Sequence, residues 1–83
     1  MADQKIGVIT HYFGKISVAA FKAESPFSVG DTVKFVRHGQ ELFTQTVTSI
    51  QEEHKVLEKA DAGQDIAIKV DKPVHEGVEV YKA

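Results

Sequence analysis

The sequence has 83 residues and a mass of 9.1 kDa, which leaves room for one small domain. It contains no cysteine, so disulfides, thiol catalysis and cysteine zinc sites are excluded together. Ten basic and twelve acidic residues give a net charge of −2, which is unlike the strongly basic balance of a dedicated nucleic-acid-binding module.

The first predicted elements form a β-hairpin. β-Branched and aromatic residues predict strands over Lys5–Phe13 and Lys15–Lys22, joined by a short loop at Phe13–Lys15. Successive side chains of a strand point to opposite faces, which places Ile9 and Phe21 on a second apolar face of the hairpin. We expect another element to cover that face, or a partner to bind it.

Two further strands are predicted in the middle of the chain. Apolar residues alternate in Thr32–Arg37, a polar hairpin loop follows at His38–Glu41, and a fourth strand runs over Phe43–Gln51. In the fourth strand the apolar residues Val47 and Ile50 are three positions apart rather than two. This slip predicts a β-bulge or a bend.

The last third of the chain begins with an ambiguous segment, Glu52–Asp61. It is rich in helix formers, but so short a helix is marginal, and a short strand followed by a turn is favoured. Alternating apolar residues then predict a strand over Asp65–Val70. A loop over Asp71–Gly77 and a closing strand over Val78–Lys82 complete the chain.

The elements together predict one all-β domain over residues 1–83, with a core from about 5 to 82. Six or seven short strands joined by Gly, Pro and Asp turns are typical of a small antiparallel sandwich or barrel. The apolar runs are only a few residues long, so no membrane span is expected. The polar start of the chain and the lack of cysteine favour a cytoplasmic location.

Several turn-and-strand segments occur in an order and at a spacing that resemble a known family. They are Val8–Lys15, Val29–Val33, Phe43–Val47, Thr46–Ile50, Lys59–Ile68 and Glu76–Val80. The segments are similar to the β-barrel second domain of translation GTPases such as elongation factor Tu. The whole chain resembles small stand-alone translation-elongation-factor-like proteins. A related barrel also looks to be appended to collagenase-like peptidases.

The resemblance implies a six-stranded or seven-stranded antiparallel Greek-key barrel of the translation-factor second-domain type. It also implies a non-catalytic binding or adaptor module that contacts RNA, the ribosome or a translation-related protein. The phosphate-loop pattern Gly-x-x-x-x-Gly-Lys-Ser/Thr and the guanine-reading pattern Asn-Lys-x-Asp are both absent. We therefore expect neither nucleotide binding nor GTPase activity.

The candidate binding residues lie at the two predicted hairpin ends. Tyr12 and Phe13 offer aromatic rings that would stack on a base or an acyl group, with Lys15 beside a phosphate. Arg37 and His38 are secondary contacts at the end of the third strand. The alternative is structural: the two rings cap the end of the barrel and the cations are solvated.

No metal site, cofactor or catalytic group is expected. The four histidines, at 11, 38, 54 and 75, have no short ligand spacing, although His38 and His75 would meet on some barrels. Adjacent residues such as Glu52 and Glu53 point to opposite faces of a strand, so they do not form an acid/base pair. The sequence therefore predicts a protein that is not an enzyme.

A second hypothesis is a protein-interaction subunit, or a stand-alone accessory domain of an enzyme such as a collagenase-like peptidase. The second apolar face of the N-terminal hairpin motivates this alternative. It predicts a protein partner or a homodimer formed through that hairpin.

Overall fold

The folded chain is built from β-strands. A computed structural model describes residues 4–52 and 55–83, and ten strands lie within those residues. The strands are β1 (Gln4–Phe13), β2 (Val18–Lys22), β3 (Phe27–Ser28), β4 (Thr32–Arg37), β5 (Gln40–Thr46), β6 (Ile50–Glu52), β7 (Lys55–Leu57), β8 (Lys59–Ala60), β9 (Asp65–Lys69) and β10 (Glu79–Lys82). The described part of the chain has no helix long and apolar enough to span a membrane.

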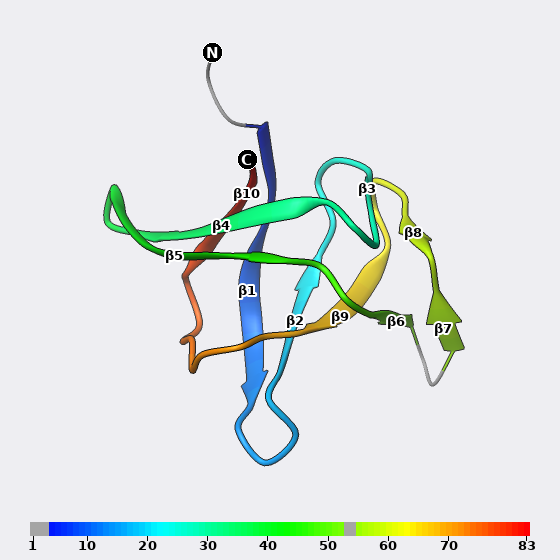
Figure 1. The fold of residues 1–83 in the computed structure, drawn as a ribbon, viewed down its shortest axis with the longest axis horizontal. Coiled ribbons are helices and arrows are strands. Elements are labelled where there is room, and N and C mark those ends of the chain that lie inside the picture. The colour runs from blue at the N-terminus through cyan, green and yellow to red at the C-terminus, as the bar shows by residue number, and fades with distance from the viewer. Residues whose placement is uncertain (1–3, 53–54) are drawn as a thin grey trace.

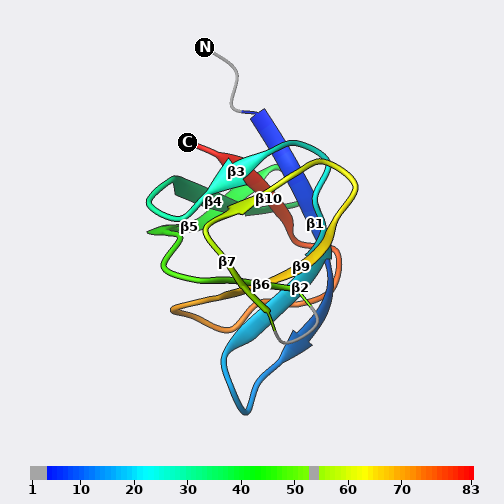
Figure 2. The same ribbon diagram turned by 90° about the vertical axis from the view of Figure 1, so that its right-hand side faces the viewer.

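Eight of the strands form one antiparallel sheet in the order β5-β4-β10-β1-β2-β9-β6-β7, and β3 pairs with β8 separately. The long strand β1 joins the two halves of the sheet, because its first half pairs with β10 and its second half with β2. Figure 1 shows β4 and β5 crossing in front of β1, and Figure 2 gives the perpendicular view.

The prediction of an all-β antiparallel domain is confirmed, but two finer predictions are wrong. Ten strands are present in the described residues instead of six or seven. The sheet is also not a closed barrel, because β5 and β7 end the strand order without pairing to each other. The extra strands are short pieces, such as β3 and β8, that carry too few residues to show a periodic pattern.

The core lies between the two halves of the sheet, and β1 contributes to it through two irregularities. The pairing of β1 shifts register between Lys5 and Gly7 and again between Ile9 and His11. Ile6 and Ile9, three residues apart, are therefore both buried. Ile9 and Phe21 are each 1% exposed and belong to the main core, so the apolar hairpin face that carries them is covered by other elements of the domain, which is the first of the two expectations. These two side chains are therefore not exposed to a partner.

The open side of the sheet is bridged by a buried side chain, Gln45 of β5. Its Nε2 donates a hydrogen bond of 2.8 Å to the carbonyl of Lys69, at the end of β9. Its Oε1 accepts one of 2.8 Å from the backbone N–H of Asp71. Gln45 is 7% exposed, and both ends of its amide are satisfied. This residue ties the two halves of the sheet together where no strand pairing does.

The first hairpin loop is longer than predicted. It spans residues 14–17, β2 begins only at Val18, and Ile16 is 63% exposed. The hairpin projects from the body at the end opposite the C-terminus, as Figures 1 and 2 both show.

The predicted fourth strand is two strands. It begins earlier, at Gln40, because the second hairpin needs only the two-residue turn His38-Gly39. It then breaks after Thr46: Val47 is buried in the connection that follows β5, and Ile50 is buried as the first residue of β6, so the two do not lie on one bulged strand. In the ambiguous segment the chain forms β7 and β8 instead of one strand and a turn; Glu53 and His54 lie outside the described residues.

Candidate functional site

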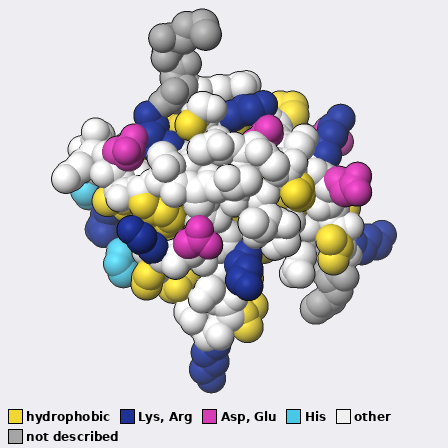
Figure 3. Space-filling view, viewed as in Figure 1, with side chains coloured by type: hydrophobic (Ala, Val, Ile, Leu, Met, Phe, Trp, Pro, Cys, Tyr) yellow, Lys and Arg dark blue, Asp and Glu magenta, His cyan; other side chains and the backbone are white. Residues whose placement is uncertain are grey.

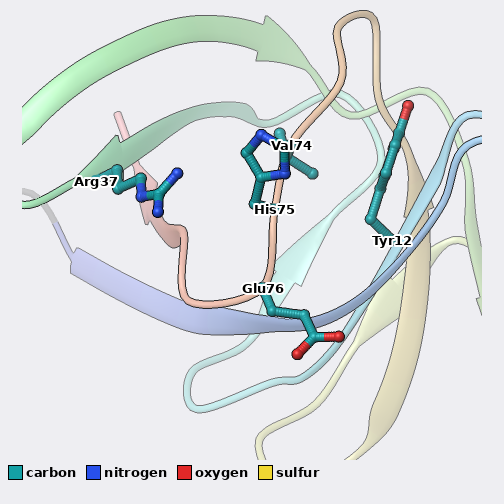
Figure 4. Close-up of a pocket in the computed structure, with 5 residues that line it drawn as sticks. All are labelled: Tyr12, Arg37, Val74, His75 and Glu76. Carbon is teal, nitrogen blue, oxygen red and sulfur yellow. The ribbon is translucent and has the colours of Figure 1, made fainter.

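Two adjoining hollows mark one side of the molecule. The larger has a volume of about 540 Å³ and is lined by Tyr12, Arg37, Val74, His75 and Glu76. In the close-up of Figure 4, Arg37 and Tyr12 lie on opposite sides of the loop that carries the other three, and the Arg37 guanidinium points toward His75. The smaller hollow, of about 240 Å³, shares two of these residues.

The smaller hollow extends the larger one along the segment that leads into β10. It is lined by Arg37, His38, Glu76, Gly77 and Glu79. Arg37 and Glu76 belong to both hollows, so the two form one trough, which we call the Arg37 trough. Figure 3 shows histidine, basic and hydrophobic side chains gathered at the left edge of the molecule.

The backbone of β1 fixes the floor of the Arg37 trough. The N–H of Ile9 donates to the carbonyl of Val78 at 2.8 Å, and the N–H of Gly77 donates to the carbonyl of Ile9 at 2.9 Å. A turn closed by the Val78 N–H and the His75 carbonyl puts Gly77 at a φ of 91°, which favours glycine. This turn holds the side chains of residues 75 and 76 at the surface.

The β4–β5 turn places Arg37 and His38. Arg37 is the last residue of β4 and pairs with Gln40 across the turn. His38 and Gly39 both have positive φ, at 51° and 77°, as a two-residue hairpin turn of type I′ requires. The side chains of Arg37 and His38 are exposed, and Arg37 forms no ion pair with any residue that the structure describes.

The predicted aromatic cluster is split by the structure. Tyr12 is half-buried, packs against the core and lines the Arg37 trough. Phe13 is 43% exposed, with its ring centroid 4.7 Å from that of His11, and it lies outside both hollows. Lys15 is exposed in the hairpin loop. The structure therefore brings together Tyr12, Arg37 and His38, and separates them from the hairpin end.

A polar network supports the rim of the trough at Glu79. Its carboxylate is 3.3 Å from the Lys5 ammonium and accepts a hydrogen bond of 3.1 Å from the Tyr81 hydroxyl. Hydrogen bonding to Glu79 is the main cause that raises the pKa of Lys5, and likewise the pKa of Tyr81, above their ordinary values. The Glu79 carboxylate thus already pairs with Lys5 and Tyr81. Glu76 is the other carboxylate that lines the trough.

His75 and Glu76 were not predicted as binding residues. From the sequence alone, His75 is a candidate only for a metal site, and both residues are expected in a loop. Within residues 4–52 and 55–83, no group of three His, Asp or Glu side chains is placed to hold a metal ion. A sequence signal that could have marked this segment is Gly77, because a glycine two residues after His75 is typical of a tight turn.

Comparison with known proteins places the fold beside peptidase domains. No protein-family model matches the chain. The crystal structure of the C-terminal domain of a protein described as a U32 peptidase, from Geobacillus thermoleovorans, superposes with a TM-score of 0.87. It covers 95% of this chain and 99% of that domain at 26% identity. A second structure of that domain gives a TM-score of 0.86 at 25% identity, covering 98% of this chain and 92% of the domain.

A sequence comparison finds similarity to part of a protease. An uncharacterized protease of Methanocaldococcus jannaschii is 30% identical over 77 residues, which are 93% of this chain. The chain spans only 19% of the length of that relative.

These findings correct the expected identity and function. The resemblance to the translation GTPase barrel and to the elongation-factor-like proteins is wrong, because the matches are to a U32 peptidase C-terminal domain and a protease. The prediction of a translation-related module that contacts RNA, the ribosome or a translation protein is therefore also wrong. The motifs that suggested it, such as Val29-Gly30-Asp31, mark tight turns between antiparallel strands and occur wherever such turns are needed. The alternative, an accessory domain of a collagenase-like peptidase, fits the findings better.

Proposed function

We propose that this chain is an accessory domain of a U32-type peptidase, where it contributes binding and no catalytic group. The observation that carries the proposal is the similarity to the Geobacillus C-terminal domain, which extends over almost the full length of both chains. Because the two domains have nearly the same length and fold, this chain could take the place of the C-terminal domain beside a peptidase.

Binding is favoured over catalysis by the make-up of the Arg37 trough. It is open, and its arginine, histidine and carboxylate surround no hydroxyl nucleophile other than the phenol of Tyr12. Arg37 and an aromatic wall are residue types that bind peptides well. The cytoplasm stays the proposed location.

The curved sheet is, in this proposal, an opened form of the expected Greek-key barrel. Gln45 supports this view, since its amide spans the gap that strand pairing leaves between β5 and the end of β9. Such a scaffold gives a small domain one rigid core and leaves its loops for binding.

A chimera tests the proposed function. In the Geobacillus thermoleovorans peptidase, this chain would replace the C-terminal domain, and hydrolysis of a denatured protein would be compared among parent, truncated and chimeric enzymes. We expect truncation to raise KM more than it lowers kcat, because a binding surface is lost. The chimera should return kcat/KM to within about threefold of the parent.

A second chimera that carries an unrelated β-domain of similar length is the matched control. The proposal is contradicted if the control domain restores kcat/KM equally well. It is also contradicted if this chain leaves the enzyme no better than truncation does, or if truncation of the parent has no effect.

A further inference from the structure

Arg37 is the one arginine of the sequence, and its side chain lines the trough. The cations at 5, 34, 59 and 82 each lie within 4 Å of a carboxylate of the protein. Arg37 forms no such pair with a described residue. A planar guanidinium binds a carboxylate through two parallel hydrogen bonds, which no lysine reproduces. The position is therefore suited to a carboxylate supplied by a ligand.

The opposite wall is suited to an apolar side chain. Tyr12 is half-buried and presents its ring to the hollow, while Val74 is 1% exposed and forms part of its base. The larger hollow, at about 540 Å³, falls in the range of about 300–1,000 Å³ that is common for small-ligand sites. One end of the trough is thus cationic and the other aromatic and apolar.

Glu76 is the carboxylate that an anion bound at Arg37 would meet in the trough. It lies in both hollows with Arg37, so a chain of phosphates along the trough would meet a carboxylate. A single carboxylate bound by Arg37 brings only one negative charge near Glu76, and the backbone N–H groups that precede a peptide's terminal residue can donate hydrogen bonds to Glu76. The protein's net charge of −2 also disfavours a polyanion.

We propose that the Arg37 trough binds the C-terminal end of a peptide. The terminal carboxylate pairs with the Arg37 guanidinium, the last side chain packs against Tyr12, and Glu76 accepts a backbone N–H. The choice of a peptide rests on the proposed function as a peptidase accessory domain. The site itself stands on the geometry of the trough.

The test uses the free chain and two fluorescent pentapeptides, Gly-Ala-Gly-Ala-Phe with a free C-terminal carboxylate and the same peptide with a C-terminal amide. Anisotropy titrations should give saturable binding of the acid, with a dissociation constant below about 1 mM. The amide should bind at least about tenfold more weakly, since a charge-assisted pair is lost. Arg37→Gln should reduce binding of the acid to the level of the amide, and Arg37→Lys should fall between.

Lys22→Gln is the matched control, because Lys22 is also exposed and lines neither hollow. It should bind the acid as the unaltered chain does, and circular dichroism would verify the fold of each variant. The proposal is overturned if acid and amide bind equally, if Arg37→Gln has no effect, or if no peptide binds at 5 mM, a concentration above the ~1 mM limit. Tighter, salt-sensitive and Arg37-dependent binding of a single-stranded RNA would overturn the choice of a peptide.

The two experiments fail independently. Loss of the acid-over-amide preference with an active chimera would remove this inference and leave the accessory function standing. If the chain prefers the acid peptide but the chimera is inactive, the accessory function is removed and this inference about the trough stands.

Discussion

Gly7 lies where β1 passes close to its neighbour in the sheet. A Cβ built there would lie 2.8 Å from Cε2 of Phe21 and 3.0 Å from the carbonyl oxygen of Lys22. Phe21 is among the largest fully buried side chains, and it stacks on Phe27 with ring centroids 5.8 Å apart. The absence of a side chain at position 7 is therefore what allows β1 to bend over the core.

Gly7→Ala is expected to lower the free energy of unfolding by about 1–3 kcal/mol, because the added methyl group must displace Phe21 in a packed core. Urea denaturation at neutral pH measures the change. Gly14→Ala is the control, since a Cβ there meets no atom closer than Cε2 of Tyr12 at 3.5 Å. Equal destabilisation by the two variants would contradict this account of Gly7.

At the residue scale, the sequence predicted part of the candidate site. Arg37 and His38 could be placed at a strand end because alternation ends there, and Tyr12 because it follows a β-branched run. Their proximity could not be predicted, since it depends on β10 lying between β1 and β4. That placement also brings His75 and Glu76 to Arg37, and local sequence carries no record of such long-range pairing.

At the scale of elements, β5 and the end of β9 are joined without strand pairing. Gln45 makes the contact, with its two hydrogen bonds to backbone groups of residues 69 and 71. The ring of Phe43 adds a contact nearby, since the Lys72 ammonium lies 5.7 Å from its centroid. The two halves of the sheet are thus held at this seam by side chains in place of a strand ladder.

Gln45→Leu is expected to destabilise the fold by roughly 2–4 kcal/mol, because two backbone groups lose their buried partner at about 1–3 kcal/mol each. Thr44→Ala, on the exposed face of the same strand, should change stability by no more than about 0.5 kcal/mol. Thermal or urea unfolding of both variants gives the comparison. A Gln45→Leu protein as stable as the Thr44→Ala protein would show that the seam does not depend on this amide.

The elements that sequence predicted best are those with regular alternation. Thr32–Arg37 is β4 with the same bounds, and the first strand differs by one residue from β1. The predictions failed where the chain leaves one half of the sheet for the other. There Val47 is buried after the end of β5 and Ile50 at the start of β6, so their spacing reflects tertiary packing instead of a strand period.

At the scale of the whole molecule, the start of β1 and the C-terminus lie at one end, and the β1–β2 hairpin at the other (Figures 1 and 2). The pairing of Gln4 with Lys82 fixes the first of these ends. A connection to a neighbouring domain through Gln4 would leave the hairpin and the Arg37 trough free for contacts. This arrangement suits a domain that binds while another part of an assembly performs catalysis.

The overall class of fold could be predicted because short alternating strands and tight turns leave few alternatives. The family could not be chosen correctly from the turn residues. Glycines such as Gly30 and Gly63, at φ values of 98° and 91°, report a local backbone requirement that many β-domains share. Function resides in exposed side chains such as Arg37, which turn motifs do not specify.

The most direct measurement of the accessory function is binding in trans. The Geobacillus thermoleovorans peptidase without its C-terminal domain would be immobilised, and this chain would be titrated over it by surface plasmon resonance. We expect saturable binding in the micromolar range, and none to the intact peptidase, whose own domain fills the position. Equal binding to both forms, or binding to neither, would contradict the assignment of this chain as a U32-type accessory domain.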